Sequence, residues 1–156
     1  MSSISTASPT ATQPPALGAP RIVGLIALLL VTIALPLIFL PMEASWGHLV
    51  FHLLGIATCV LAVLLLRDVR RLSQGKAVPV LTWVTTVFFA AWLVGHIGEL
   101  FVVLTHGGAH ADHDVFDHPT HVFFASIAVP GWMASVVTTL ILLIAVVVSV
   151  VRRARG

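Results

Sequence analysis

Histidines and one glutamate recur at helical spacing inside apolar segments of this chain. His48 and His52 are four residues apart in "HLVFHLLGIATCVLAVLLL", and His96 and Glu99 are three apart in "FFAAWLVGHIGELFVVL". Residues at these spacings project from one face of a helix. Imidazole binds zinc, copper, iron and nickel, and a carboxylate beside it widens the choice towards iron and manganese. The two pairs therefore predict a metal site built from facing helices of a bundle.

A second group of polar residues lies in the stretch "THGGAHADHDVFDHPTH", which runs from Thr105 to His121. Its last two histidines, His118 and His121, are predicted to be further ligands or to close the site as a lid. The other polar residues are predicted to support the ligands or to collect metal ions: His106, His110, His113, Asp112, Asp114 and Asp117. The alternative is that these histidines only form a solvated loop that responds to pH.

The composition indicates the surroundings of these residues. The chain has 156 residues, of which 58% are hydrophobic and 9% are charged, whereas soluble domains carry about 25% charged residues. Four apolar runs, at about 22–40, 48–66, 80–105 and 132–151, approach the ~20 residues that cross a bilayer core. Each span must satisfy its own backbone hydrogen bonds. We therefore expect an all-α, polytopic membrane protein with one four-helix domain over residues 21–151.

The segments outside the spans have distinct compositions. Residues 1–20 are rich in Ser, Thr, Pro and Ala and are predicted to form a flexible cytoplasmic tail. Residues 152–156 form a basic C-terminus. Residues 106–131 are predicted to be a long loop, whose apolar second half could form a short interfacial helix. Pro36 is expected to kink the first span, whereas Pro130 is expected to mark a span boundary.

The basic residues predict the orientation of the chain. All eight Lys and Arg lie before the first span, between the second and third, or after the fourth. Because positive residues favour the cytoplasmic side, both termini are predicted to be cytoplasmic and the histidines to lie in the outer half. The Ala/Val/Arg-rich, lysine-poor composition suggests a bacterium of high GC content. We therefore expect a bacterial inner-membrane protein with its His-rich loop outside the cytoplasm.

The rise of a helix places the buried ionisable residues at similar depths. At 1.5 Å per residue, His52, Glu99 and His96 lie roughly 8, 9 and 14 Å from the outer edge of the bilayer. An ionisable group inside a span is costly unless it is paired or hydrated, so it is a functional hypothesis by default. These residues and His48 are therefore expected to share one site, which takes copper, iron or zinc.

A b-type haem is the alternative cofactor, because bis-histidine ligation needs one histidine from each of two facing helices. His52 and His96 would be the axial ligands, and Gly55 and Gly95 would make room for a bulky group. The chain has no second histidine pair in its inner half, which excludes a two-haem path across the membrane.

The function expected from these features is a small subunit of a larger membrane oxidoreductase, such as a metal-dependent oxygenase or a respiratory complex. A stand-alone enzyme is less expected, and lipid and other membrane subunits are the expected partners. One alternative is transport or handling of divalent metal ions. Another is a structural accessory subunit without a cofactor, in which the histidines only satisfy one another. Nucleic-acid binding is not expected, and the chain lacks GxSxG, Walker and dinucleotide-binding motifs.

Overall fold

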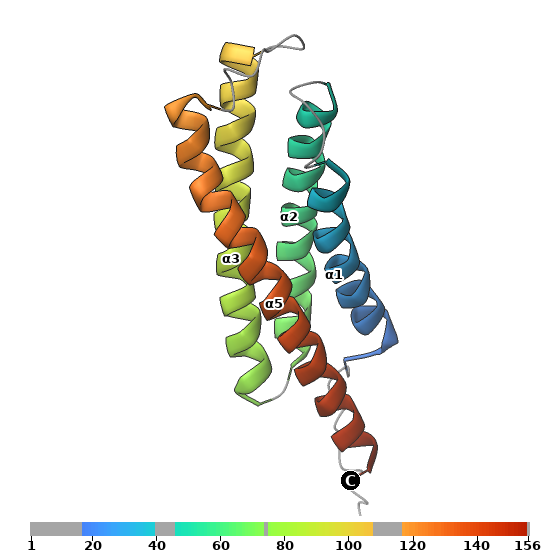
Figure 1. Cartoon of the computed structure of the whole chain (residues 1–156). Coiled ribbons are helices and arrows are strands. Elements are labelled where there is room, and N and C mark those ends of the chain that lie inside the picture. Colours follow the sequence, from blue (N-terminus) through green and yellow to red (C-terminus); the bar gives the residue numbers. More distant parts are fainter. Residues whose placement is uncertain (1–16, 40–45, 74, 108–116, 156) are drawn as a thin grey trace, which may run out of the picture.

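The computed structural model describes residues 17–39, 46–73, 75–107 and 117–155. Within these ranges the regular structure is helical throughout, which confirms the all-α prediction. Figure 1 shows the arrangement of the helices. They are α1 (Ala19–Phe39), α2 (Trp46–Leu72), α3 (Ala77–Val102) and α5 (Pro119–Arg155), and a π-helical turn, η1 (Val103–Gly107), follows α3. The predicted tail falls almost wholly outside the described residues.

All four helices are long and apolar enough to cross a membrane, as the sequence predicts. Large apolar side chains such as Leu30, Leu61 and Val80 point outward and are at least 60% exposed, so lipid is the solvent that suits this surface. Most described hydroxyl groups inside the bundle donate to a carbonyl of their own helix. Thr58 and Thr85, for example, each donate to the carbonyl four residues earlier.

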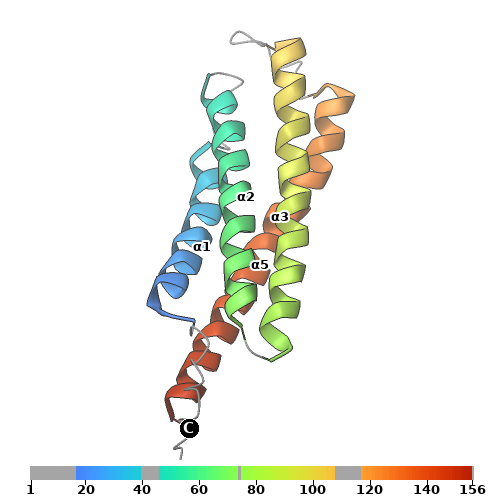
Figure 2. The same cartoon turned by 180° about the vertical axis from the view of Figure 1, so that it is seen from behind.

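The helices form a four-membered bundle, in which α2 packs on α1 and α3, and α5 packs on α3 and α1 (Figures 1 and 2). The contact between α3 and α5 is the most extensive of these. Small residues allow it: a Cβ added to Gly95 would lie 2.7 Å from the Cα of Ala128, and one added to Gly131 would lie 2.8 Å from the amide nitrogen of Trp92. Glycine therefore sets how closely the two backbones approach.

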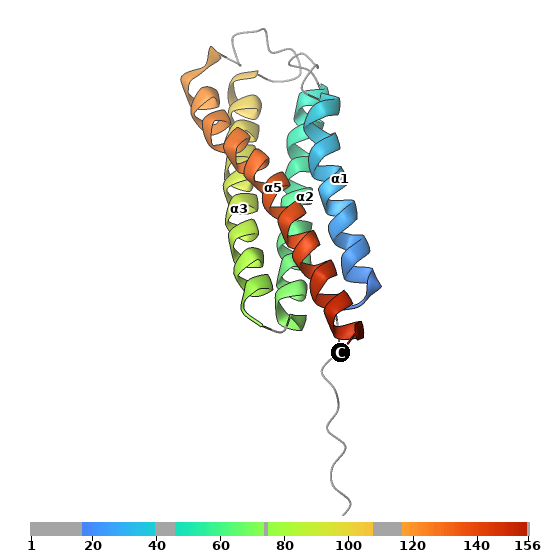
Figure 3. The ribbon, with the colours of Figure 1, turned by 60° about the horizontal axis from the view of Figure 1, so that its bottom comes forward.

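The two ends of the bundle carry different chemistry. We call one the histidine end, where α1 and α3 finish and α2 and α5 begin; the other is the arginine end, near the labelled C-terminus (Figure 3). An ion pair between Arg21 and Asp68, with Nε and Oδ2 3.0 Å apart, joins α1 to α2 at the arginine end. Helix α2 continues to Leu72, so Arg67, Arg70 and Arg71 extend from a helix rather than from a loop.

No helix boundary lies at Pro130, contrary to the prediction, because α5 is one helix of 37 residues that begins at Pro119. The segment 119–131 is therefore helical instead of a loop, and within the described residues there is no separate interfacial helix. A proline inside a membrane helix removes one backbone hydrogen bond, and packing against neighbouring helices compensates for this loss. Here the packing comes from Gly95 and Gly98 of α3, which face Ala128 and Phe124 of the same segment.

Pro36 has a specific structural consequence in α1. Proline has no backbone N–H, so the carbonyl of Thr32, four residues earlier, loses its partner within the helix. The indole Nε1 of Trp132 on α5 donates to this carbonyl at 2.7 Å. The proline therefore creates an acceptor that ties α1 to α5.

This bond predicts the effect of Trp132→Phe, which keeps an aromatic ring and removes the donor. We expect the free energy of unfolding in detergent micelles, measured by circular dichroism, to fall by about 0.5–2 kcal/mol. In a Pro36→Ala background the restored amide N–H can reach the Thr32 carbonyl, so the same Trp132 change should cost clearly less. An equal cost in both backgrounds would contradict the role assigned to the proline.

Candidate metal centre

His52 lies at the centre of a buried polar cluster at the histidine end. Its side chain has no solvent exposure. Its Nδ1 lies 3.0 Å from Nδ1 of His96, and its Nε2 lies 3.0 Å from Nε2 of His48, both within hydrogen-bonding distance. A neutral imidazole carries one donor and one acceptor. The three rings therefore form a directional hydrogen-bonded chain that links α3 to α2.

Glu99 brings a carboxylate against this chain. It is 6% exposed on α3, and its Oε2 lies 3.5 Å from Nε2 of His52 and 3.7 Å from Nε2 of His121 on α5. One ligand atom each from His48, Glu99 and His121 lie within 4.8 Å of one another. Three helices thus converge on one point. We call His48, His52, His96, Glu99 and His121 the His/Glu cluster.

The distances in the cluster are close to those of a metal site. Zinc binds imidazole nitrogen and carboxylate oxygen at about 2.0–2.2 Å, so neighbouring ligand atoms around a tetrahedral ion are about 3.3 Å apart. The separation of 3.7 Å between Nε2 of His121 and Oε2 of Glu99 is near this value, and the ligand atoms of His48, Glu99 and His121 all lie within 4.8 Å of one another. Small side-chain rotations of His48, Glu99 and His121 would therefore suffice to surround an ion.

The surroundings of His96 indicate which way the imidazole chain donates. Its Nε2 is buried and has no hydrogen-bond partner among the described residues. It also faces the backbone of α2, since a Cβ added to Gly55 would lie 2.1 Å from it. A buried N–H without an acceptor is rarer than an unsatisfied acceptor. We therefore assign the proton of His96 to Nδ1, which donates to His52, and His52 then donates through Nε2 towards His48 and Glu99.

This assignment separates the roles within the His/Glu cluster. Because Nε2 of His52 carries a proton, it acts as a donor rather than as a metal ligand. If His48 bound an ion through Nε2, that nitrogen could no longer accept from His52, and the His52 donor would remain with Oε2 of Glu99, 3.5 Å away. His48, Glu99 and His121 remain as the candidate ligand set. His96 acts through His52 and is fixed in place by the rings of Phe51 and Trp92, whose centroids each lie 5.0 Å from its own.

A cavity of about 420 Å³ adjoins the cluster. His48, His96, Glu99 and His121 form its polar side. The remaining walls are apolar or aromatic and come from all four helices: Pro36, Phe39, Phe51, Trp92, Ala125, Ala128, Val129 and Trp132. The candidate ligands are therefore open on one side to a largely apolar space.

The structure brings five of the six predicted ligand residues together and leaves His118 outside the group. Nδ1 of His118 accepts a hydrogen bond from the backbone N–H of Thr120 at 3.3 Å, at the start of α5. Asp117 is exposed, and His106 belongs to η1. His110, His113, Asp112 and Asp114 lie outside the described residues.

Sequence reasoning did not identify the contacts that hold the cluster in place. Gly55 and Gly95 were expected to make room for a cofactor, whereas in the structure they accommodate the His96 ring and Ala128. Trp92, one turn before His96 on α3, was not singled out. Its spacing of four residues places it on the same face of the helix as His96, and this spacing could have indicated the contact between the two rings.

Comparisons of the chain with known protein families, with curated proteins and with solved structures found no match. The chemistry of the His/Glu cluster is therefore interpreted from its own geometry.

The contact between Gly55 and His96 predicts a strong effect of Gly55→Ala. The added methyl group would overlap the ring, so His96 must move and its hydrogen bond to His52 must break. We expect the free energy of unfolding to fall by about 1–3 kcal/mol. The matched control is Gly24→Ala on α1, where the added Cβ meets only the flexible end of Leu65 at 3.2 Å. That change should be close to neutral, and similar losses at both positions would refute the proposed contact.

Proposed function

We propose that this protein binds a divalent transition metal ion through His48, Glu99 and His121, inside a membrane-spanning bundle. The observation that carries the proposal is the convergence of these three ligand atoms, from three different helices, to within 4.8 Å. Ionisable residues are costly among apolar helices and are usually found there for a functional reason. A bound cation would compensate the buried carboxylate and use the imidazole lone pairs.

The donor set favours a reactive ion over a purely structural one. Structural zinc sites are closed by four protein ligands, whereas catalytic sites keep a position open. Two histidines and one carboxylate with open positions are typical of non-haem iron oxygenases, and the same donors also bind zinc in hydrolases. The cavity beside the cluster supplies space on the open side. A redox role would require iron or copper, because zinc does not change its oxidation state.

We place this metal centre in a subunit of a membrane oxidoreductase. The apolar walls of the cavity suit an apolar substrate or a hydrophobic redox partner. Besides the cluster, the walls of this cavity offer few polar groups for binding a soluble substrate. Further membrane subunits would then supply electrons or complete the catalytic site.

The geometry of the cluster supports a metal ion over haem. A bis-histidine haem needs its iron and its porphyrin plane between the two axial nitrogens. Nδ1 of His52 and Nδ1 of His96 are only 3.0 Å apart, so α2 and α3 would have to separate to admit the ring.

A transport path is also less well supported. Thr58, Thr82 and Thr85, towards the arginine end, bond to carbonyls of their own helices.

The proposed location is the bacterial inner membrane, with both termini in the cytoplasm and the histidine end facing outward. The basic side chains described at the arginine end support this orientation through the positive-inside rule. The metal centre would then lie in the outer leaflet.

Metal analysis of the full chain, purified with a tag that contains no histidine, tests the proposed ligands. We expect stoichiometric iron, copper or zinc in the native protein. The changes His48→Ala, Glu99→Gln and His121→Ala should each abolish stoichiometric binding. Loss of the supporting donor in His52→Ala should weaken binding about 10–100-fold.

His118→Ala is the matched control, because His118 was predicted as a ligand and lies outside the cluster. It should retain the full metal content. An equal loss of metal in His118→Ala and His121→Ala would contradict the ligand set. A Soret band in the native protein that is lost in both His52→Ala and His96→Ala would show that the cofactor is haem and not a metal ion. Native protein that contains neither metal nor haem would refute the proposed function.

Labelling with a membrane-impermeant maleimide tests the orientation. In a Cys59→Ala background, Asp117→Cys should react in intact cells, since Asp117 is exposed beside the start of α5 at the histidine end. Ser73→Cys, at the arginine end, should react only after the cells are opened. The reverse pattern would place the metal centre on the cytoplasmic side.

A further inference from the structure

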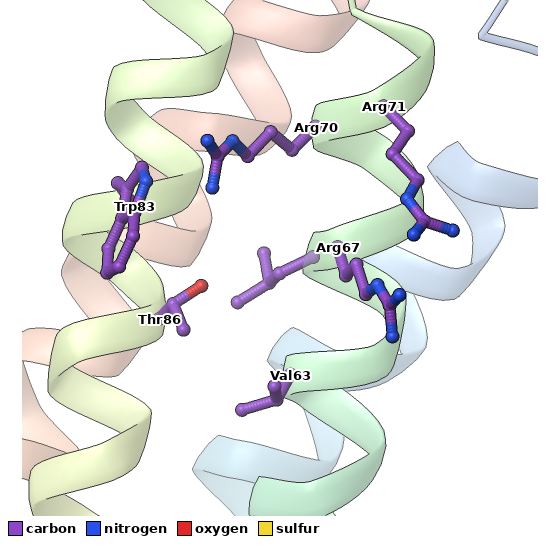
Figure 4. A pocket seen from close by; sticks show the side chains of 7 residues that line it. Val63, Arg67, Arg70, Arg71, Trp83 and Thr86 are labelled. Carbon is purple, nitrogen blue, oxygen red and sulfur yellow. The ribbon is translucent and has the colours of Figure 1, made fainter.

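A second cavity lies at the arginine end, between α2 and α3, far from the His/Glu cluster along both helices. Its volume is about 390 Å³. Arg67, Arg70 and Arg71 line it from α2, with Trp83 and Thr86 from α3 and with Val63 and Leu66 at its apolar side. Figure 4 shows Arg70 reaching from α2 towards Trp83, whereas the side chains of Arg67 and Arg71 extend from the same helix in the direction away from Trp83. We call this cavity the arginine groove.

The positive charge of the arginine groove is not neutralised within the described residues. Asp68 is the acidic residue on the same stretch of α2, and it pairs with Arg21 of α1. None of the described carboxylates forms an ion pair with the three arginines of the groove. The guanidinium carbon of Arg70 lies 5.4 Å from the ring centroid of Trp83, a cation–π contact that holds the arginine in place without cancelling its charge.

The groove combines recognition of an anion with contact to an apolar chain. Guanidinium groups bind phosphate oxygens through paired hydrogen bonds. The surface next to the groove is apolar, since Leu64 of α2 and Val87 of α3 are 55% and 53% exposed. A ligand that fits must therefore carry a negatively charged headgroup, which binds at the arginines, and a hydrocarbon tail, which runs parallel to α2 and α3.

The position of the groove identifies where such a ligand comes from. It lies where α2 ends and α3 begins, at the ends of two helices apolar enough to span a membrane. Phospholipid headgroups occupy this level of a bilayer, and basic pockets between membrane helices bind anionic ones. We propose that the arginine groove is a binding site for an anionic glycerophospholipid. Its phosphate lies against Arg70, its acyl chains follow Leu64 and Val87, and the charges of Arg67 and Arg71 on the neighbouring face of α2 strengthen the attraction.

Native mass spectrometry of the full chain in neutral detergent tests this site. The probes are phosphatidylglycerol and phosphatidylcholine with identical acyl chains, at equal concentrations. We expect the native protein to bind phosphatidylglycerol at least tenfold more strongly, since each arginine near a headgroup contributes a factor of about five. The triple change Arg67→Gln, Arg70→Gln and Arg71→Gln should remove this preference. Detergent solution makes the result independent of the direction of insertion.

The matched control removes the same charge from the same end of the bundle, through Arg152→Gln, Arg153→Gln and Arg155→Gln on α5. This variant should keep the preference for phosphatidylglycerol. A second readout is the quenching of the protein's tryptophan fluorescence by brominated lipids. Quenching by brominated phosphatidylglycerol should exceed that by brominated phosphatidylcholine, and this excess should disappear in Trp83→Phe. Equal losses in both triple variants, or no preference in the native protein, would overturn the proposal. Displacement of the lipid by equimolar inorganic phosphate would assign the groove to a soluble anion instead.

Discussion

A polar group inside this bundle is stabilised by a partner within the bundle, because the helices are suited to a solvent that offers none. His52 meets this constraint with both of its ring nitrogens, one towards His96 on α3 and one towards His48 on its own helix. The constraint also gives the imidazole chain a direction. Nε2 of His96 lies against the backbone at Gly55 and has no acceptor there. The N–H groups of His96 and His52 therefore point away from Gly55 and towards Glu99. The arrangement of the candidate metal ligands follows from this single buried ring.

The third candidate ligand depends on helix packing. His121 reaches Glu99 because α5 begins at Pro119 and lies along α3 for its first turns. That approach requires Gly95 and Gly98, since a side chain at either position would collide with Ala128 or Phe124. Small residues on α3 thus act on the chemistry indirectly, by setting the distance between two backbones that carry ligands. The bond between Trp132 and the carbonyl of Thr32 then ties α1 to the same helix and helps to complete the cavity wall.

Composition and helical periodicity were sufficient for the fold class and for placing His52, His96 and Glu99 at one level along the bundle. Depth follows from a fixed rise per residue, so it can be counted from the sequence. The rotation of each helix and its contacts with other helices cannot be counted in this way. Pro130 therefore suggested a boundary, because local propensity disfavours a helix there, whereas packing on α3 carries the helix through it. The same error placed His121 in a loop together with His118 and gave both residues one role. In the structure His121 lies on α5 and reaches Glu99, whereas His118 precedes the helix.

The middle of the bundle constrains what the His/Glu cluster can do. Between the cluster and the arginine groove, Thr58, Thr82 and Thr85 donate to carbonyls of their own helices, and Cys59 is buried without exposure. An ion at the cluster would therefore find no sequence of ligands to follow towards the arginine end. It would be a resident ion, approached from the histidine end or from the cavity. Because that cavity is walled by Phe51, Trp92 and Trp132, the molecules best able to reach the ion are those that already dissolve in the membrane.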